Sequence, residues 1–230
     1  MRQTITRYMF TPYCGLFVSY ETMRQKIWRH MFAGSLLILI SVLAVMAARQ
    51  MDFGPERPAP AFRTFGRSDA KIHIHEFTDF ACPGCRTANE RLHKLMEYYG
   101  DAVLVYFKHF PLISIHSRSF DAAVAADCAG RQGKFRQYAD RLFEKQEAWS
   151  VSTGTPDEFS LLASRLDMSQ EAFEKCRKDP ETAKAVTLDM AEGRVRSVHA
   201  TPTFFVNRKR LVGSSQLLEE AKRFDSISGR

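Results

Sequence analysis

The sequence predicts an α/β domain behind one apolar N-terminal segment, and three observations lead to this fold class. A strand, a helix and a second strand follow one another between residues 71 and 107. Helical patterns then occupy residues 119–196. Two short strands and a last helix lie between residues 203 and 224. This order is that of an α/β domain whose two halves are separated by a helical block.

The apolar segment, residues 31–48, contains 18 residues without a charge, which is just long enough to cross a bilayer as a helix. Three basic residues precede it within residues 24–29, so the positive-inside rule places residues 1–30 in the cytoplasm and the rest of the chain outside. A cleaved signal sequence is the alternative, because small residues end the segment. The length of the segment favours an uncleaved transmembrane anchor.

The net charge of +7 gives no support for nucleic-acid binding, because much of it lies outside the globular part. Residues 1–30 carry five Lys or Arg and one Glu, so +4 of the total precedes the apolar segment. The remaining charge of +3 is spread over 200 residues. Translation from either Met1 or Met23 leaves basic residues in front of the apolar segment.

A proline-containing linker, residues 49–61, leads to the globular domain, which we assign to residues 62–230. Three patterns predict its first three elements. Alternation of apolar residues predicts a strand, apolar residues at helical spacing that end before Gly100 predict a helix, and a continuous apolar run predicts a second strand. These are a strand at Lys71–Phe77, a helix at Pro83–Tyr99 and a strand at Val103–Phe107.

Periodicity and capping residues predict the remaining elements. Thr155, followed by Pro156, is the expected N-cap of one helix, and Ser169 is the expected N-cap of another. The predicted helices begin with Phe120–Ala129 and Phe135–Phe143, continue after Thr155 and Ser169, and end with Gln216–Phe224. Two short strands, Thr203–Asn207 and Arg210–Val212, precede the last helix.

The residues Cys82-Pro83-Gly84-Cys85 follow a strand and open a helix, and this setting indicates a redox motif. A thiol at a helix N-terminus lies beside unpaired backbone N–H groups and the positive end of the helix dipole. Both favour the thiolate, so Cys82 is the predicted nucleophile. Cys85, one turn further along, is the predicted resolving cysteine. Pro83 suits the first helical position, where its missing N–H is not needed.

A zinc site and a purely structural disulfide are the alternatives for this cysteine pair. Zinc usually takes four ligands from paired motifs, whereas the chain has one Cys-x-x-Cys and no His-x-x-x-His. Neither alternative accounts for the position of the pair between a strand and a helix. The sequence therefore predicts no metal and no organic cofactor.

Residues from about Phe62 to Phe224 resemble the DsbA-like thiol–disulfide oxidoreductases of the thioredoxin superfamily. The Cys-Pro-Gly-Cys motif, followed about 115 residues later by Thr-Pro-Thr-Phe-Phe-Val, is far more specific than Cys-x-x-Cys alone. The resemblance implies a thioredoxin-like fold with a helical insertion, at about residues 113–196, between its two halves. The motifs that carry it are GRSDA at 66–70, HEFTDFACPGC at 75–85, KHFPL at 108–112 and ATPTFFVN at 200–207.

The resemblance also implies roles for three residues outside the motif. Pro202 matches the family's cis-proline, which faces the cysteine pair, and the backbone beside Thr201 can pair with a bound peptide. Glu76, six residues before Cys82, matches the family's buried acid. A carboxyl group on the inward face of a strand should have a raised pKa and can exchange a proton with Cys85. An exposed Glu76 at a sheet edge is the alternative.

Gly84 departs from the best-known oxidase of the family, which has a histidine between the proline and the second cysteine. Glycine offers only its backbone N–H to the thiolate. We therefore expect the pKa of Cys82 to lie below that of a free thiol but above the value of about 3.5 in the strongest oxidant. A less oxidising reduction potential should accompany it.

Cys128 and Cys176 lie on predicted helices of a domain that faces an oxidising compartment. We expect them to form a structural disulfide, and two separate buried thiols are the alternative. The bond would close a loop of about 49 residues and stabilise the fold by about 3–4 kcal/mol through loop entropy.

The sequence thus predicts an oxidase that passes the Cys82–Cys85 disulfide to secreted or periplasmic protein thiols. The resemblance implies a quinone-linked membrane partner that reoxidises the pair. There are two alternatives. The first is a reductase or isomerase that a membrane thiol donor keeps reduced, and the second is a periplasmic chaperone-like binding module without redox function. The expected location is the outer side of the inner membrane, or the periplasm if the apolar segment is cleaved.

Overall fold

The structure, a computed structural model, describes residues 16–50, 57–151 and 157–228, with side chains in the first of these ranges from residue 25 to residue 46. The chain divides into two compact units, residues 1–53 and 54–230.

Helix α1, Leu16–Gln50, is the N-terminal unit's main element and has 35 residues. Its part from Gln25 to Met46 is long and apolar enough to cross a membrane, and none of it is buried. Among the described residues, this is the one helix with those properties, which a signal sequence also has. The expected span at 31–48 largely coincides with it. The helix begins at Leu16, so part of the segment expected before the membrane is also helical.

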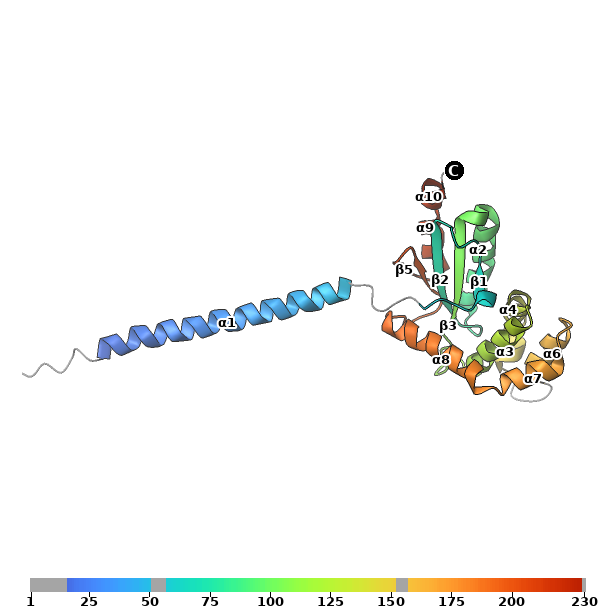
Figure 1. Ribbon diagram of the computed structural model, residues 1–230, viewed down its shortest axis with the longest axis horizontal. Coiled ribbons are helices and arrows are strands. Elements are labelled where there is room, and N and C mark those ends of the chain that lie inside the picture. Colours follow the sequence, from blue (N-terminus) through green and yellow to red (C-terminus); the bar gives the residue numbers. More distant parts are fainter. Residues whose placement is uncertain (1–15, 51–56, 152–156, 229–230) are drawn as a thin grey trace, which may run out of the picture. The chain divides into compact units, whose positions relative to one another are not determined.

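A five-stranded sheet forms the centre of the second unit (Figure 1). The strand order is β1-β3-β2-β4-β5, with β2 and β3 parallel and the other neighbours antiparallel. Because β2 lies in the middle of the sheet, nearly all of it is buried, although its sequence alternates like a half-exposed strand. The strands are β1 Thr64–Phe65, β2 Ile72–Thr78, β3 Val103–His109, β4 Thr203–Val206 and β5 Lys209–Val212.

Helices cover both faces of this sheet. On one face, apolar side chains of α2 (Pro83–Tyr99), α9 (Ser214–Ala221) and α10 (Phe224–Ser228) bury residues of β2, β3 and β4. On the other face, α8 (Pro180–Val195) passes so close that a Cβ on Gly193 would come within 2.5 Å of the Phe110 ring. A side chain at Gly193 would therefore require the Phe110 ring or α8 to shift.

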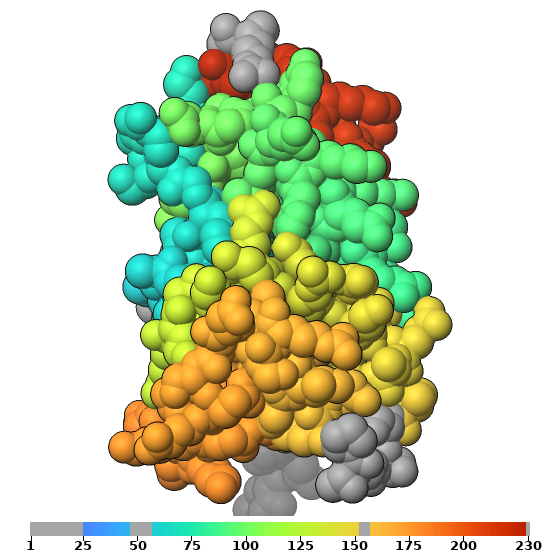
Figure 2. Space-filling view, turned by 90° about the vertical axis from the view of Figure 1, so that its right-hand side faces the viewer, coloured from blue at the N-terminus to red at the C-terminus, as the bar shows by residue number. Residues whose placement is uncertain are grey.

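A block of helices follows β3 and precedes β4 in the sequence. In the folded unit these helices gather at one end (Figures 1 and 2). Its own core contains the fully buried rings of Tyr138, Trp149, Phe159 and Phe173. Besides α8, the block contains α3 Ser119–Arg131, α4 Phe135–Glu144, α5 Gln146–Val151, α6 Glu158–Ser164 and α7 Gln170–Arg177. The fold is thus thioredoxin-like with a helical insertion, as the sequence predicts.

Several element boundaries differ from the predicted ones. The expected N-cap at Thr155 is wrong, because α6 begins after Asp157, whose side chain accepts the Phe159 N–H at 3.1 Å. Thr155 and Pro156 themselves lie outside the described residues. The predicted last helix is two helices, α9 and α10, and β1 was not predicted because two residues carry no periodicity. The bounds of α2 and the N-cap Ser169 are confirmed.

Candidate active site

The cysteine motif lies where β2 gives way to α2. The strand ends at Thr78, a short loop follows, and Cys82 is the N-cap of the helix that begins at Pro83. The Cys82 carbonyl accepts the N–H groups of Cys85 at 3.0 Å and Arg86 at 3.3 Å. The loop and the first helical turn therefore fix the Cys82 side chain at the positive end of the helix dipole.

Cys82 is half-buried and its thiol is strongly acidified. A hydrogen bond from Cys85 contributes most to lowering its pKa to about 5, against the opposing effect of burial. The side chain of Thr201 and the backbone N–H groups of Cys85 and Gly84 lower the pKa further. The value lies between those of a free thiol, about 8.5, and the strongest oxidant, about 3.5, as Gly84 leads one to expect.

Cys85 differs from Cys82 in both burial and acidity. Its side chain is fully buried, and this burial raises the pKa of its thiol well above the usual range. The thiolate of Cys82 raises the Cys85 pKa further, and the backbone N–H of Asp79 donates to Cys85 Sγ at 3.4 Å. One cysteine thus holds a thiolate while its neighbour holds a proton, which is the division expected of a nucleophile and a resolving thiol.

Thr201 and Pro202 face the cysteines across the loop before β4. The Thr201–Pro202 peptide bond is cis, and Cys82 Sγ donates to the Thr201 carbonyl at 3.3 Å. A Cβ on Gly84 would meet Pro202 Cδ at 3.5 Å and Cys82 Sγ at 3.7 Å. The structure therefore brings the motif residues 82–85 together with Thr201 and Pro202, which follow about 119 positions later in the sequence.

Glu76 lies on β2, the strand that leads into the cysteine motif, and is 1% exposed. Burial raises the pKa of its carboxyl to about 8, and the nearby Thr78 hydroxyl lowers it slightly. Its Oε1 atom is buried without a hydrogen-bond partner among the described residues. Glu76 is thus a central-strand residue rather than an exposed edge residue, and it holds a proton at neutral pH.

Two residues that the sequence analysis did not single out organise the active-site loop. The buried Asp79 carboxylate accepts the N–H of Ala81 at 2.8 Å and, with its other oxygen, the N–H of Leu112 and Nδ1 of His116, both at 2.8 Å. Gln146 of α5 donates to the carbonyls of Phe80 at 2.7 Å and Cys82 at 2.9 Å. An Asp directly after a strand is a turn signal, so the sequence could have indicated the contact of Asp79 with the Ala81 N–H. No local pattern indicates the contacts of Gln146.

Cys128 and Cys176 form a disulfide between α3 and α7, with an S–S distance of 2.07 Å. Both lie within the helical insertion. The described residues contain no group of three or more His, Cys, Asp or Glu that could hold a metal ion. The groups that the structure brings together at the cysteine motif are two thiols and the backbone of Thr201 and Pro202.

A Cys-x-x-Cys pair at a helix N-terminus that faces a cis-proline defines a protein of the thioredoxin class. A family model described as Thioredoxin matches residues 59–226, so the chain belongs to the thioredoxin family.

Solved structures with the same fold include two DsbA proteins and BdbD. Wolbachia pipientis alpha-DsbA1 superposes with a TM-score of 0.64 at 22% identity, covering 76% of this chain and 94% of that one. BdbD from Bacillus subtilis gives a TM-score of 0.64 at 22% identity, covering 78% and 100%. Pseudomonas aeruginosa DsbA2 gives 0.59 at 26% identity, covering 73% and 96%. The chain is a DsbA-like protein of the thioredoxin superfamily.

Curated relatives match only over part of their length. The Na(+)/H(+) antiporter NhaA 1 of Mycolicibacterium vanbaalenii is 34% identical over 145 residues, which are 62% of this chain and 22% of the antiporter. The NhaA antiporter of Herminiimonas arsenicoxydans is 31% identical over 149 residues, 65% of this chain and 23% of the antiporter. The chain thus spans about a fifth of the length of these relatives.

Proposed function

We propose that this protein is a thiol–disulfide oxidoreductase that oxidises the thiols of protein substrates through Cys82 and Cys85. The observation that carries the proposal is the contrast between the two cysteines: the pKa of Cys82 is lowered to about 5, while that of the buried Cys85 is raised. A stabilised thiolate is a good leaving group, so a mixed disulfide on Cys82 is readily resolved in favour of the reduced enzyme.

The steps follow from this contrast. A substrate thiolate attacks Cys82 Sγ of the oxidised protein, the Cys82–Cys85 bond breaks, and Cys85 leaves as a thiolate that takes a proton from Glu76. The substrate's second thiolate then attacks the substrate sulfur held on Cys82. The substrate disulfide forms, Cys82 leaves as its stabilised thiolate, and two electrons have passed from the substrate to the enzyme.

The residues beside the cysteines suit a peptide substrate. The cis peptide bond before Pro202 leaves the backbone at Thr201 next to Cys82 Sγ. An extended peptide can pair with this backbone as an added strand, which would hold its cysteine against Cys82. We assign Thr201 and Pro202 to substrate binding on this basis.

The apolar part of α1 supports a location at a membrane. We propose that it anchors the catalytic domain on the outer side of the inner membrane, because basic residues precede it in the sequence. A quinone-linked membrane protein would reoxidise the Cys82–Cys85 pair there. A secreted form after signal cleavage would place the same domain in the same compartment.

The reduction potential of the Cys82–Cys85 pair tests the direction of the reaction. We would equilibrate the full-length chain in detergent micelles with glutathione buffers and measure the reduced fraction. We expect a value between about −120 and −200 mV, within the range of disulfide donors. A value near about −270 mV, as in thioredoxin, would mean that the protein is held reduced and acts as a reductase or isomerase.

A double substitution, Cys82→Ser with Cys85→Ser, separates the redox function from a chaperone function. We expect the variant to lose all disulfide formation in a reduced dithiol peptide. Suppression of the aggregation of an unfolded protein would be measured alongside it. If that suppression were the protein's only activity, and survived the double substitution, the protein would be a binding module and not an oxidoreductase.

A further inference from the structure

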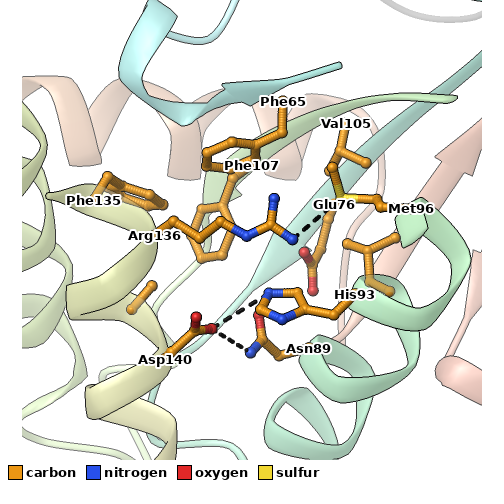
Figure 3. A pocket seen from close by; sticks show the side chains of 12 residues that line it. Phe65, Glu76, Asn89, His93, Met96, Val105, Phe107, Phe135, Arg136 and Asp140 are labelled. Carbon is orange, nitrogen blue, oxygen red and sulfur yellow. Dashed lines mark hydrogen bonds and ion pairs between the residues drawn. The ribbon is translucent and has the colours of Figure 1, made fainter. Parts of the chain in front are cut away.

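A narrow pocket reaches from the protein surface to the buried Glu76 (Figure 3). It lies between α2 and α4 and is floored by side chains of β1, β2 and β3. The space inside it for the centres of water molecules is about 20 Å³, which is enough for about one ordered water. The pocket thus connects a carboxyl group that is 1% exposed with the solvent.

Polar groups stand at the wall of this pocket in a fixed arrangement. His93 Nε2 lies 3.3 Å from Asp140 Oδ1, and the Asn89 side-chain amide donates to the same oxygen at 2.9 Å. The side chains of His93 and Asp140 are 35% and 40% exposed, so this pair touches the solvent. Figure 3 shows the Glu76 carboxyl group and the His93 ring both pointing into the pocket.

The thiol chemistry needs a proton path at this place. Cys85 is fully buried, and so is Glu76, the acid proposed to exchange a proton with it. Thr78 follows Glu76 on the same face of β2 and is also buried, at the end of the strand that leads into the cysteine motif. A proton that reaches Glu76 must still travel to the solvent in every catalytic cycle.

We propose that His93 and a water molecule in this pocket carry the proton between Glu76 and the solvent. The inference rests on the proposed thiol–disulfide exchange and names the proton path for it. Glu76 Oε1, which lacks a partner among the described residues, is the atom that the water would bind. Asp140 orients the His93 ring, and Asn89 orients Asp140.

The proton balance is complete. When Cys85 leaves as a thiolate, Glu76 gives it a proton and becomes a carboxylate. The water then donates a proton to Glu76 and receives one from the protonated His93, which is in turn reprotonated by the solvent. When the enzyme is reoxidised, Cys85 loses its proton and the same path runs outward.

Among the charged groups around the pocket, His93 is the one suited to this task. Burial lowers the pKa of its imidazole below the usual value, an effect that Asp140 opposes and Arg136 supports. An imidazole ring has one nitrogen that can accept a proton while the other donates one. The guanidinium group of Arg136 of α4 donates to Met96 Sδ at 3.9 Å and offers no acceptor atom. Asp140 of α4 faces His93 and holds it, and Glu76 of β2 is the buried end of the path.

The substitution His93→Gln tests this inference in the full-length protein. The Glu76-dependent step would be followed as the pre-steady-state rate of oxidation of a dithiol peptide, over a range of pH and at low buffer concentration. We expect a loss of about tenfold or more, within the range of general acid–base effects. Added imidazole should restore the rate, because a diffusing base can replace the lost ring at the solvent-exposed mouth.

The matched control is His73→Gln, which removes an imidazole whose Nε2 contacts the Ala70 carbonyl outside the pocket. It should keep the wild-type rate and pH profile. A second variant, Ala139→Leu, fills the pocket from α4 without removing a titratable group, so its loss of rate should not respond to imidazole.

The outcomes separate the two proposals. An inactive wild-type protein would overturn the proposed function and this inference with it. If the wild-type protein is active, two results would overturn the proton path alone. One is a His93→Gln variant that keeps the wild-type rate at all pH values, and the other is a slowed variant whose rate imidazole does not restore. An unchanged reduction potential in His93→Gln would show that the thiols themselves are intact.

Discussion

Glu76 and Gly84 are the two residues at which the chemistry of this site is most open to measurement. The first holds a proton inside the sheet, since burial raises the pKa of its carboxyl to about 8. The second leaves the space between Cys82 and Pro202 without a side chain. Each has a consequence that a single substitution reveals.

Replacing Glu76 with Gln should stabilise the fold at neutral pH while it impairs proton transfer. The usual pKa of 4.5 applies to the unfolded chain, so between pH 4.5 and about 8 the unfolded chain releases a proton that the folded protein keeps. Stability therefore falls as the pH rises through this window, by on the order of 3 kcal/mol at pH 7. Glu76→Gln removes this loss.

Urea unfolding of wild type and Glu76→Gln at several pH values would measure this effect. The two proteins should differ little at pH 4 and increasingly up to about pH 8, where the difference levels off. A difference that stays constant across this range would show that Glu76 does not hold a buried proton.

Replacing Gly84 with His should lower the pKa of Cys82 further and raise the reduction potential of the pair. A histidine beside the thiolate adds a positive charge or a hydrogen bond to it. The ultraviolet absorbance of the thiolate as a function of pH gives the pKa directly. Gly84→Ala is the control, because its Cβ would make ordinary contacts of 3.5 Å or more and should leave the pKa of Cys82 nearly unchanged.

At the scale of elements, the site depends on one helix end and on a block of helices inserted elsewhere in the chain. The N-terminus of α2 places Cys82 and Cys85 one turn apart. Gln146 of α5 then binds the carbonyls of Phe80 and Cys82 from the insertion. The insertion therefore supports the active-site loop as well as covering it.

The disulfide between α3 and α7 should stabilise this insertion without affecting the redox site. Cys128 and Cys176 are 48 residues apart, which corresponds to about 4 kcal/mol of loop entropy. The double substitution Cys128→Ala with Cys176→Ala should lower the free energy of unfolding by about that amount. The pKa of Cys82 should not change, and a change in it would show that the two cysteine pairs are coupled.

At the scale of the whole molecule, the chain combines an apolar helix with a thioredoxin-like domain as two separate units. We expect a membrane-impermeant thiol reagent to label Cys82 in intact spheroplasts, because the half-buried thiolate should face the outer compartment. Cys82→Ser provides the control for specific labelling. Labelling that required an opened membrane would place the domain on the cytoplasmic side instead.

The sequence by itself determined the local features of this protein. The Cys-Pro-Gly-Cys motif after an apolar strand was sufficient to place Cys82 at a helix N-terminus, since the signals involved span only a few residues. The length of α2, the N-cap Ser169 and the apolar N-terminal helix follow from periodicity, capping and composition in the same way.

Only the tertiary structure decided which distant residues share a site. Three features join parts of the chain that are distant in the sequence. They are the contact of Asp79 with His116, the hydrogen bonds of Gln146 to the active-site loop, and the pocket that Glu76 and His93 line. Such contacts depend on how helices and strands pack, and packing leaves no local periodicity in the sequence. The sequence led us to expect a raised pKa for Glu76, but only the tertiary structure excludes an exposed position at a sheet edge, because β2 lies in the middle of the sheet and the carboxyl group is buried there.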